Sequence, residues 1–228
     1  MAKKSTSPWI YFGCGCVTLA VLIAVGFGAL GFAGFRAAKN FEAGLKDPEV
    51  RAARSLETLG AESLPEGWHA YMQVKIPMVM EMVLVSNGEP PPEGAVPDDW
   101  NNDQLGDSAF VFINMRNLGD ARADLERALE AGAEPANVDV GFNSNERIGS
   151  GTLEMAYGNV RWTSHRGSFN NQNRDGVYTM FVLDCEPADE RVRMGFYWLA
   201  AEPESDLAGS PADETELDRF LGQFALCG

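Results

Sequence analysis

Histidine is scarce in this chain of 228 residues, which contains only His69 and His165. A zinc site with two histidine ligands would need both of them, and no pair of Cys or His residues has zinc-finger spacing. Ser164 directly precedes His165, but neighbours in a strand point to opposite faces and do not form a nucleophile–base pair. The sequence therefore predicts no catalytic residues and no cofactor.

Basic residues are also few, since 18 Lys and Arg stand against 33 Asp and Glu, for a net charge of −15. This excess disfavours nucleic acid and anionic lipid headgroups as partners. Several arginines nevertheless concentrate in the C-terminal half, where they either bind an anionic partner or form the ordinary solvated face of a sheet. They are Arg161, Arg166, Arg174, Arg191 and Arg193.

Charge is absent altogether from Trp9 to Phe35. A helix of that length reaches roughly 40 Å, more than the ~30 Å hydrocarbon core of a membrane. A cleavable signal peptide has an apolar region of only ~7–15 residues, although Gly31 and Ala33 leave a cleavage site open. We therefore expect a single uncleaved transmembrane helix at 9–35, preceded by a basic cytoplasmic tail at 1–8.

The orientation of this span follows from its flanks. Counting Lys and Arg on both sides keeps the following domain inside, but short basic tails stay cytoplasmic and long domains translocate largely regardless of charge. We expect an extracytoplasmic domain, either periplasmic or on the cell surface. Within the span, Ala20, Ala24 and Gly28 recur at every fourth residue. They either form a homodimer contact or reflect the common use of small residues in membrane helices.

The four cysteines form two different pairs. Cys14 and Cys16 lie inside the span, whereas Cys185 and Cys227 lie in the following domain. In an oxidising compartment the second pair predicts one disulfide, which would tie down the end of the chain. Two free buried thiols are the alternative.

The remaining chain is long enough for one domain. Residues 36–63 predict a helical stalk or lid, with Asp47 as N-cap, Pro48 at the first helical position and Gly60 at the end. Residues 64–228 predict one α+β domain, an antiparallel sheet of about 6–8 strands packed by an internal helix and a C-terminal helix. Ser210 is the expected N-cap of the last helix. The Gly-Ser-Gly run at 149–151 predicts a turn.

A Pro-rich loop is expected at 87–107, because this stretch shows no periodicity. Loops of that length are often functional or disordered. Trp100, in its middle, is the one large apolar group there that is available to bind a partner. Alternatively, it folds back onto the domain.

The most specific local pattern is PMVMEMVL, in which Met78, Met80 and Met82 alternate and so share one face of a strand. Thioethers are soft ligands that select Cu(I), and His69 could add a nitrogen. The competing interpretation is core packing, with Glu81 marking the solvent side. Metal binding is thus the alternative, and no bound metal is the primary expectation.

The basic tail, the Gly-rich span, the LPEGW entry into a β-rich domain and the closing FLGQFALC resemble uncharacterised single-pass membrane-anchored proteins of bacteria. The element order over residues 64–226 also resembles the PsbP-type α/β/α sandwich. That resemblance implies an accessory or binding domain. We therefore expect a membrane-anchored, non-enzymatic accessory or binding protein with a protein or envelope partner; the alternative is a copper-binding or copper-delivery module.

Overall fold

The computed structural model describes residues 47–94, 105–116, 122–123, 126–127, 129, 142–169, 174–185, 190–201 and 206–228. All of them belong to the unit Phe41–Gly228. No helix within these residues is long and apolar enough to cross a membrane. The predicted span at 9–35, its small-residue ridge and Trp100 lie outside the described residues.

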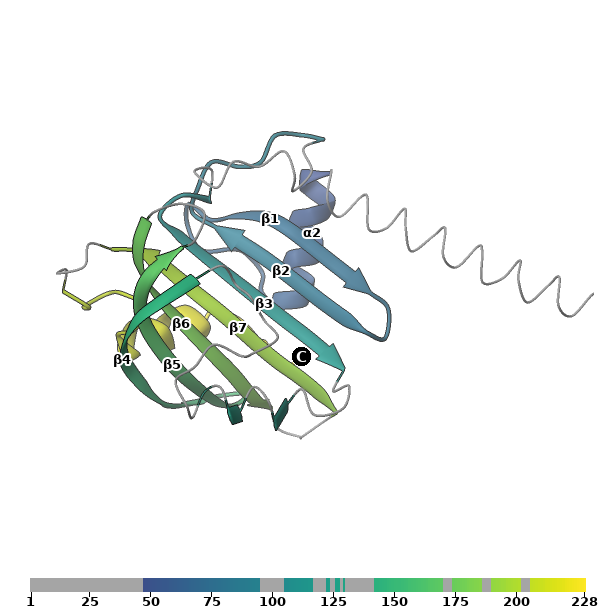
Figure 1. Ribbon diagram of the computed structural model, residues 1–228. Helices are drawn as coiled ribbons and strands as arrows, with labels where there is room; N and C mark the ends of the chain where they lie inside the picture. Colours follow the sequence, from purple (N-terminus) through teal and green to yellow (C-terminus); the bar gives the residue numbers. More distant parts are fainter. Residues whose placement is uncertain are drawn as a thin grey trace, which may run out of the picture. The chain divides into compact units, whose positions relative to one another are not determined.

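A single antiparallel sheet of seven strands organises the domain (Figure 1). Its strands run in the order β1-β2-β3-β7-β6-β5-β4, so the N-terminal strands occupy one edge and the hairpins of the C-terminal half the other. The bounds are β1 His69–Ile76, β2 Met80–Ser86, β3 Ser108–Arg116, β4 Phe142–Met155, β5 Gly158–Phe169, β6 Arg174–Cys185 and β7 Arg191–Ala200. The predicted α+β domain built on an antiparallel sheet is confirmed.

The first described helix, α2 (Pro48–Leu59), begins and ends as the sequence predicts. The Asp47 carboxylate accepts hydrogen bonds from the backbone N–H groups of Glu49 and Val50, at 3.0 and 3.1 Å. Gly60 ends the helix with φ 61, in the left-handed region that favours glycine. The end of the chain also passes close by, because a Cβ on Gly60 would lie 2.7 Å from the carbonyl oxygen of Ala225.

Helix α2 packs on the sheet, so of the two alternatives predicted for residues 36–63, a stalk or a lid, its described part agrees with the lid. Leu59 is fully buried in the main core. Arg51 is only 1% exposed and its Nε donates to the carbonyl oxygen of Ala70 in β1, at 2.7 Å. Burial lowers the pKa of Arg51. A helix with such an anchor belongs to the domain and covers it.

The closing helix, α4 (Glu214–Leu221), starts three residues later than Ser210 as N-cap would place it. Asp213 caps it instead, accepting from the N–H of Thr215 at 3.0 Å, while its other oxygen accepts from Gly209 at 3.0 Å. These backbone hydrogen bonds, that of Gly209 foremost, lower the pKa of Asp213. Ser210 shapes the preceding turn, because its hydroxyl accepts from the N–H of Ala212 at 3.2 Å.

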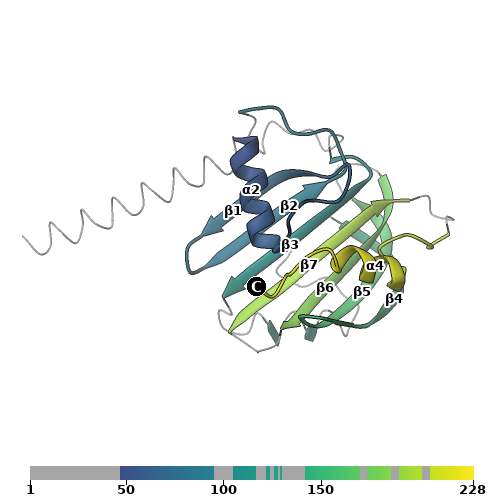
Figure 2. The same cartoon turned by 180° about the vertical axis from the view of Figure 1, so that it is seen from behind.

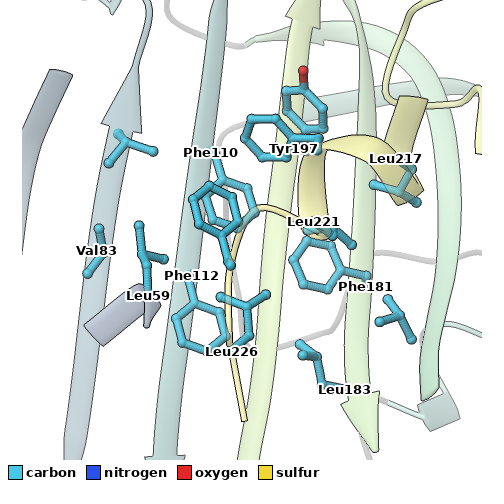
Figure 3. Close-up of a cluster of buried hydrophobic side chains, with 14 of the residues drawn as sticks. Leu59, Val83, Phe110, Phe112, Phe181, Leu183, Tyr197, Leu217, Leu221 and Leu226 are labelled. Atoms are coloured by element: carbon cyan, nitrogen blue, oxygen red, sulfur yellow. The ribbon is translucent and has the colours of Figure 1, made fainter. Parts of the chain in front are cut away.

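Both helices cover the same face of the sheet (Figure 2). The core beneath them is rich in aromatic rings, and Phe110 lies at its centre (Figure 3). The Phe110 ring stacks on Phe181 and Phe224 at centroid distances of 5.9 and 5.5 Å, and meets Phe220 edge-on at 5.1 Å. We call this side the helix face.

The opposite side, the second face, has a smaller core. Tyr178, Met180, Phe196 and Trp198 are buried there together with Leu129. Residues 122–123, 126–127 and 129 are helical and belong to the predicted internal helix. Two of their side chains are tied to the sheet by ion pairs, Glu126 with Arg161 at 3.1 Å and Arg122 with Asp184.

Strand β4 includes the Gly-Ser-Gly run at 149–151, which corrects the turn predicted there. The physical reason is a large neighbour on β5. A Cβ on Gly149 or Gly151 would lie 3.0 or 3.1 Å from the indole of Trp162. The two glycines therefore make room for the buried Trp162 ring within the sheet.

Candidate functional site at the tip of the first hairpin

The methionine row lies on the second face of the sheet, away from the helices. Met80 pairs with Ile76 and Met82 with Val74, whereas Val83 on the other side of β2 enters the main core. Met80 and Met82 are half-buried. Met78 is outside the strand and 80% exposed. Core packing therefore does not account for Met78, whereas Met80 and Met82 are half-buried.

Glu81 lies on the helix face, which corrects its assignment to the solvent side. Its carboxylate pairs with Lys75 across the β1–β2 ladder at 2.9 Å, and Glu57 of α2 is 3.6 Å from the same ammonium group. The hydrogen bond to Glu81 is the main cause that raises the pKa of Lys75. A carboxylate thus serves as an ion-pair partner on the covered face.

The turn between β1 and β2 consists of residues 77–79. The N–H of Val79 donates to the carbonyl oxygen of Ile76 at 3.0 Å, and its own carbonyl accepts from the N–H of Arg116 at 2.9 Å. Met78 has φ 61, and it is the one non-glycine residue with positive φ in the described part of the chain. Such strain costs about 1–2 kcal/mol and gathers at functional sites.

This tip is apolar and open to solvent. Ile76, Met78 and Val79 are 43%, 80% and 45% exposed. Among the residues that the structure describes, these three are the exposed large hydrophobic side chains. We call these three residues the hairpin tip.

A hollow of about 360 Å³ lies next to the hairpin tip, where the start of β2 meets the end of β3 and the start of β7. In the sheet register Met80 stands directly opposite Met115 of β3, so three methionines border one space. The lining residues are Ile76, Met78, Val79, Met80, Glu81, Asn114, Met115, Arg116, Glu190 and Arg191.

Two arginines stand opposite each other at the rim of this hollow. Arg116 of β3 pairs in register with Arg191 of β7, and both are exposed. Directly opposed like charges cost a fraction of a kcal/mol in a sheet. One step inward, the buried Oδ1 of Asn114 has no hydrogen-bond partner among the described residues. The rim thus combines cationic and apolar groups.

The remaining arginines do not form one patch. Arg161 is held by Asp184 and Glu126. Arg174 pairs with Asp107 and lies 5.7 Å from the ring centre of Trp198. Arg193 is 4% exposed. Of the five concentrated in the sequence, only Arg191 lines the hollow.

His69 is not brought to the methionines. It begins β1 and pairs with Ser86, whereas Met80 pairs with Ile76 at the other end of the ladder. Seven residues of strand separate the two ends, which is about 23 Å. The ligand set of Met78, Met80, Met82 and His69 therefore does not meet at one point.

Cys185 and Cys227 are bonded, as the sequence predicts, with Cα atoms 5.6 Å apart. The bond joins the end of β6 to the penultimate residue, and both side chains pack against the main core. It fastens the chain end over the helix face.

His165 has a serine partner, but it is Ser144 of β4 and not its neighbour Ser164. The Ser144 hydroxyl and His165 Nδ1 are 2.8 Å apart, whereas Ser164 pairs with Thr179 at 2.6 Å. Burial, with the nearby charge of Arg147, lowers the pKa of His165. Thr163 contacts the other ring nitrogen at 3.4 Å, and among the described residues no carboxylate orients the imidazole as in a catalytic triad.

Acid-rich or histidine-rich metal sites are not found either. In the ranges that the structure describes, no three His, Cys, Asp or Glu residues are grouped closely enough to hold a metal ion. Sequence reasoning missed Ile76, Val79 and Met115 as site residues. Apolar residues at a turn could have indicated Ile76 and Val79. Met115 could not be found in this way, because only the register of β2 with β3 places it beside Met80.

Comparison with known proteins adds little. No protein-family model and no curated protein matches this chain. Among solved structures, the chain is similar to the 1.9 Å crystal structure of the Saccharomyces cerevisiae Ran-binding protein Mog1p. The identity is 10%, the TM-score is 0.39, and the match covers 72% of this chain and 88% of that one. We transfer no property from it, and the resemblances drawn from the sequence remain predictions.

Proposed function

We propose that this chain is a membrane-anchored, non-enzymatic binding protein whose domain engages a protein partner through the hairpin tip and the adjoining hollow. The observation that carries the proposal is the exposure of Ile76, Met78 and Val79 at one point of an otherwise well-packed domain. Exposed apolar groups gathered beside a hollow are typical of interaction sites.

The rim indicates the chemistry of the partner. Arg116 and Arg191 oppose each other beside the apolar tip. Guanidinium groups form charge-assisted hydrogen bonds with carboxylates, and arginine together with apolar anchors is enriched at binding hot spots. The partner is therefore a polypeptide segment that presents an apolar side chain next to an acidic one. An anionic membrane surface is the poorer fit, because the chain carries a net charge of −15.

The proposed location is the outer side of a cell membrane, with residues 9–35 as the anchor. The Cys185–Cys227 bond supports this, because disulfides persist in oxidising compartments. Homodimerisation through Ala20, Ala24 and Gly28 is a further part of the proposal. Alkaline phosphatase fused after Gly228 should be active, and a cytoplasm-only fluorescent protein fused there should stay dark; the reverse pattern would place the domain inside.

Site-specific photo-crosslinking in native membranes tests the docking surface. The crosslinking amino acid p-benzoylphenylalanine replaces Val79 in the full chain, and a matched control carries it at Glu66. Glu66 is also exposed but lies before β1, at the opposite end of that strand. We expect a discrete protein adduct at Val79 that is absent at Glu66. The adduct should fade with Ile76→Ser and disappear with Arg116→Glu combined with Arg191→Glu.

The other outcomes count against the proposal. Lipid adducts alone would assign the tip to the membrane, and equal protein adducts at both positions would indicate random encounter. An adduct that survives charge reversal unchanged would exclude an acidic partner segment. Thermal unfolding of each variant confirms that the comparison is made on folded protein. The partner, once identified by mass spectrometry, is then titrated directly against the wild type and the charge-reversed variant.

A further inference from the structure

We infer that the hollow at the hairpin tip also holds a Cu(I) site, formed by the thioether sulfurs of Met78, Met80 and Met115. This goes beyond the proposed docking function and does not depend on it. This ligand set differs from the alternating row Met78, Met80 and Met82. It takes Met78 from the turn, Met80 from β2 and Met115 from β3.

The sheet register brings two of the ligands together. Met80 and Met115 are directly paired in the β2–β3 ladder, so their side chains project from the same face. The Cβ atoms of such a pair are about 4.5–5.5 Å apart, within reach of one ion for two flexible methionine side chains. Both residues line the hollow.

The turn supplies the third ligand. Met78 lines the same hollow and is 80% exposed, so its side chain gains no burial in the domain. Its backbone is held at φ 61, where a methionine is disfavoured. Met78 therefore contributes little to packing in the described part of the domain and is free to act as the third ligand.

The donor chemistry selects the metal. Three neutral thioethers are soft ligands, which prefer Cu(I) over Zn²⁺, Ca²⁺ or Mg²⁺. Glu190 also borders the hollow and places a carboxylate on the same rim as Arg116 and Arg191. The ion binds as Cu(I), without electron transfer and without displacing a proton from sulfur.

Met82 and His69 provide internal controls. Met82 is on the same face of β2 as Met80 but does not line the hollow. His69 lies at the far end of β1. If the hollow is the site, substituting Met82 or His69 should not change the Cu(I) affinity. If the alternating row is the site, substituting Met82 should weaken it.

The test is an anaerobic competition of the full chain against a chromogenic Cu(I) chelator. Cys14 and Cys16 are soft ligands themselves, so every protein compared carries Cys14→Ser and Cys16→Ser. In that background we expect about one Cu(I) per chain, bound through sulfur as seen by X-ray absorption. Met80→Leu and Met115→Leu should each weaken binding by about tenfold or more, while Met82→Leu and His69→Ala should leave it unchanged.

Leucine nearly conserves the volume of methionine, so these variants should remain folded, and thermal unfolding verifies this. Equal loss with Met82→Leu and Met115→Leu would overturn the assignment to the hollow. Uptake no stronger than in a protein with Met78, Met80 and Met115 all changed to Leu would end the copper inference. The docking proposal is tested separately, because Ile76→Ser and the arginine reversals leave all three thioethers in place.

Discussion

The two ends of the β1–β2 hairpin are built for different purposes. At the end where β1 begins and β2 finishes, Tyr71 and Ser86 are fully buried. The Ser86 hydroxyl donates to the carbonyl of Ser108 at 2.6 Å, and the Asn87 side chain accepts from the Asp107 and Ser108 N–H groups at 3.0 and 2.8 Å. At the tip, three apolar side chains face solvent. One end stabilises the fold, and the other is available to a ligand.

The largest effect is expected where the packed end meets the main core. Phe110 pairs in register with Val85 and is fully buried against Phe181 and Phe224. Phe110→Ala should lower the free energy of unfolding by about 3–5 kcal/mol, because it removes a buried ring and leaves a cavity. Urea denaturation of the wild type and the variant measures this. A loss below 1 kcal/mol would show that the helix face is not the main core.

The disulfide should come next. Replacing both Cys185 and Cys227 with Ala opens a link between residues 42 positions apart. Loop-closure entropy gives a loss of roughly 3–4 kcal/mol in unfolding free energy. The double variant avoids the unpaired thiol that a single substitution would leave. The contrary result is native wild-type protein, taken from an oxidising compartment, in which a thiol reagent labels both Cys185 and Cys227. In that case the disulfide does not form there.

The disulfide prediction rests on a feature that the sequence already indicated. The caps of α2 and the cysteine pair could both be predicted, because the caps depend on local chemistry and only two cysteines lie in the domain. The start of α4 could not, since Ser210 and Asp213 are both good caps and only the surrounding packing selects between them.

The face of the methionine row was the more instructive failure. Strand period shows that Met80 and Met82 share a side, but β2 carries apolar residues on both sides. Only the placement of α2 and α4 decides that Val83 and Val85 face the main core. For the same reason, Met115 could not be assigned to the hollow before the β2–β3 register was known.

The stability of the domain should depend on pH through His165. This residue lies in β5 and pairs in register with Tyr178 of β6. Its lowered pKa means that the folded protein favours the neutral imidazole. The unfolded chain binds the proton more readily below its ordinary pKa of about 6.5, so this contribution to stability is full above that pH and is lost as the pH falls toward the folded pKa.

His165→Asn removes this titration and keeps a side chain that can bond to Ser144. Urea denaturation of both proteins between about pH 5 and 8 should therefore give stability curves that run parallel above pH 6.5 and converge or cross below it. Every other residue is the same in both proteins and cancels in the difference. Curves that stay parallel through the whole range would show that His165 is protonated as readily in the folded state.

The smallest effect should be found at the hairpin tip. Val79 and Ile76 are 45% and 43% exposed, so each loses only part of a full burial when changed to Ser, and the hydrogen bonds of Val79 use only its backbone. Val79→Ser and Ile76→Ser should each lower the free energy of unfolding by about 1 kcal/mol, while crosslinking to the partner falls. Phe110→Ala, measured beside them, should show a large loss of stability, although Phe110 is fully buried and contacts no partner directly. A tip variant that destabilised the domain as much as the core variant would mean that both ends of the hairpin serve the fold alone.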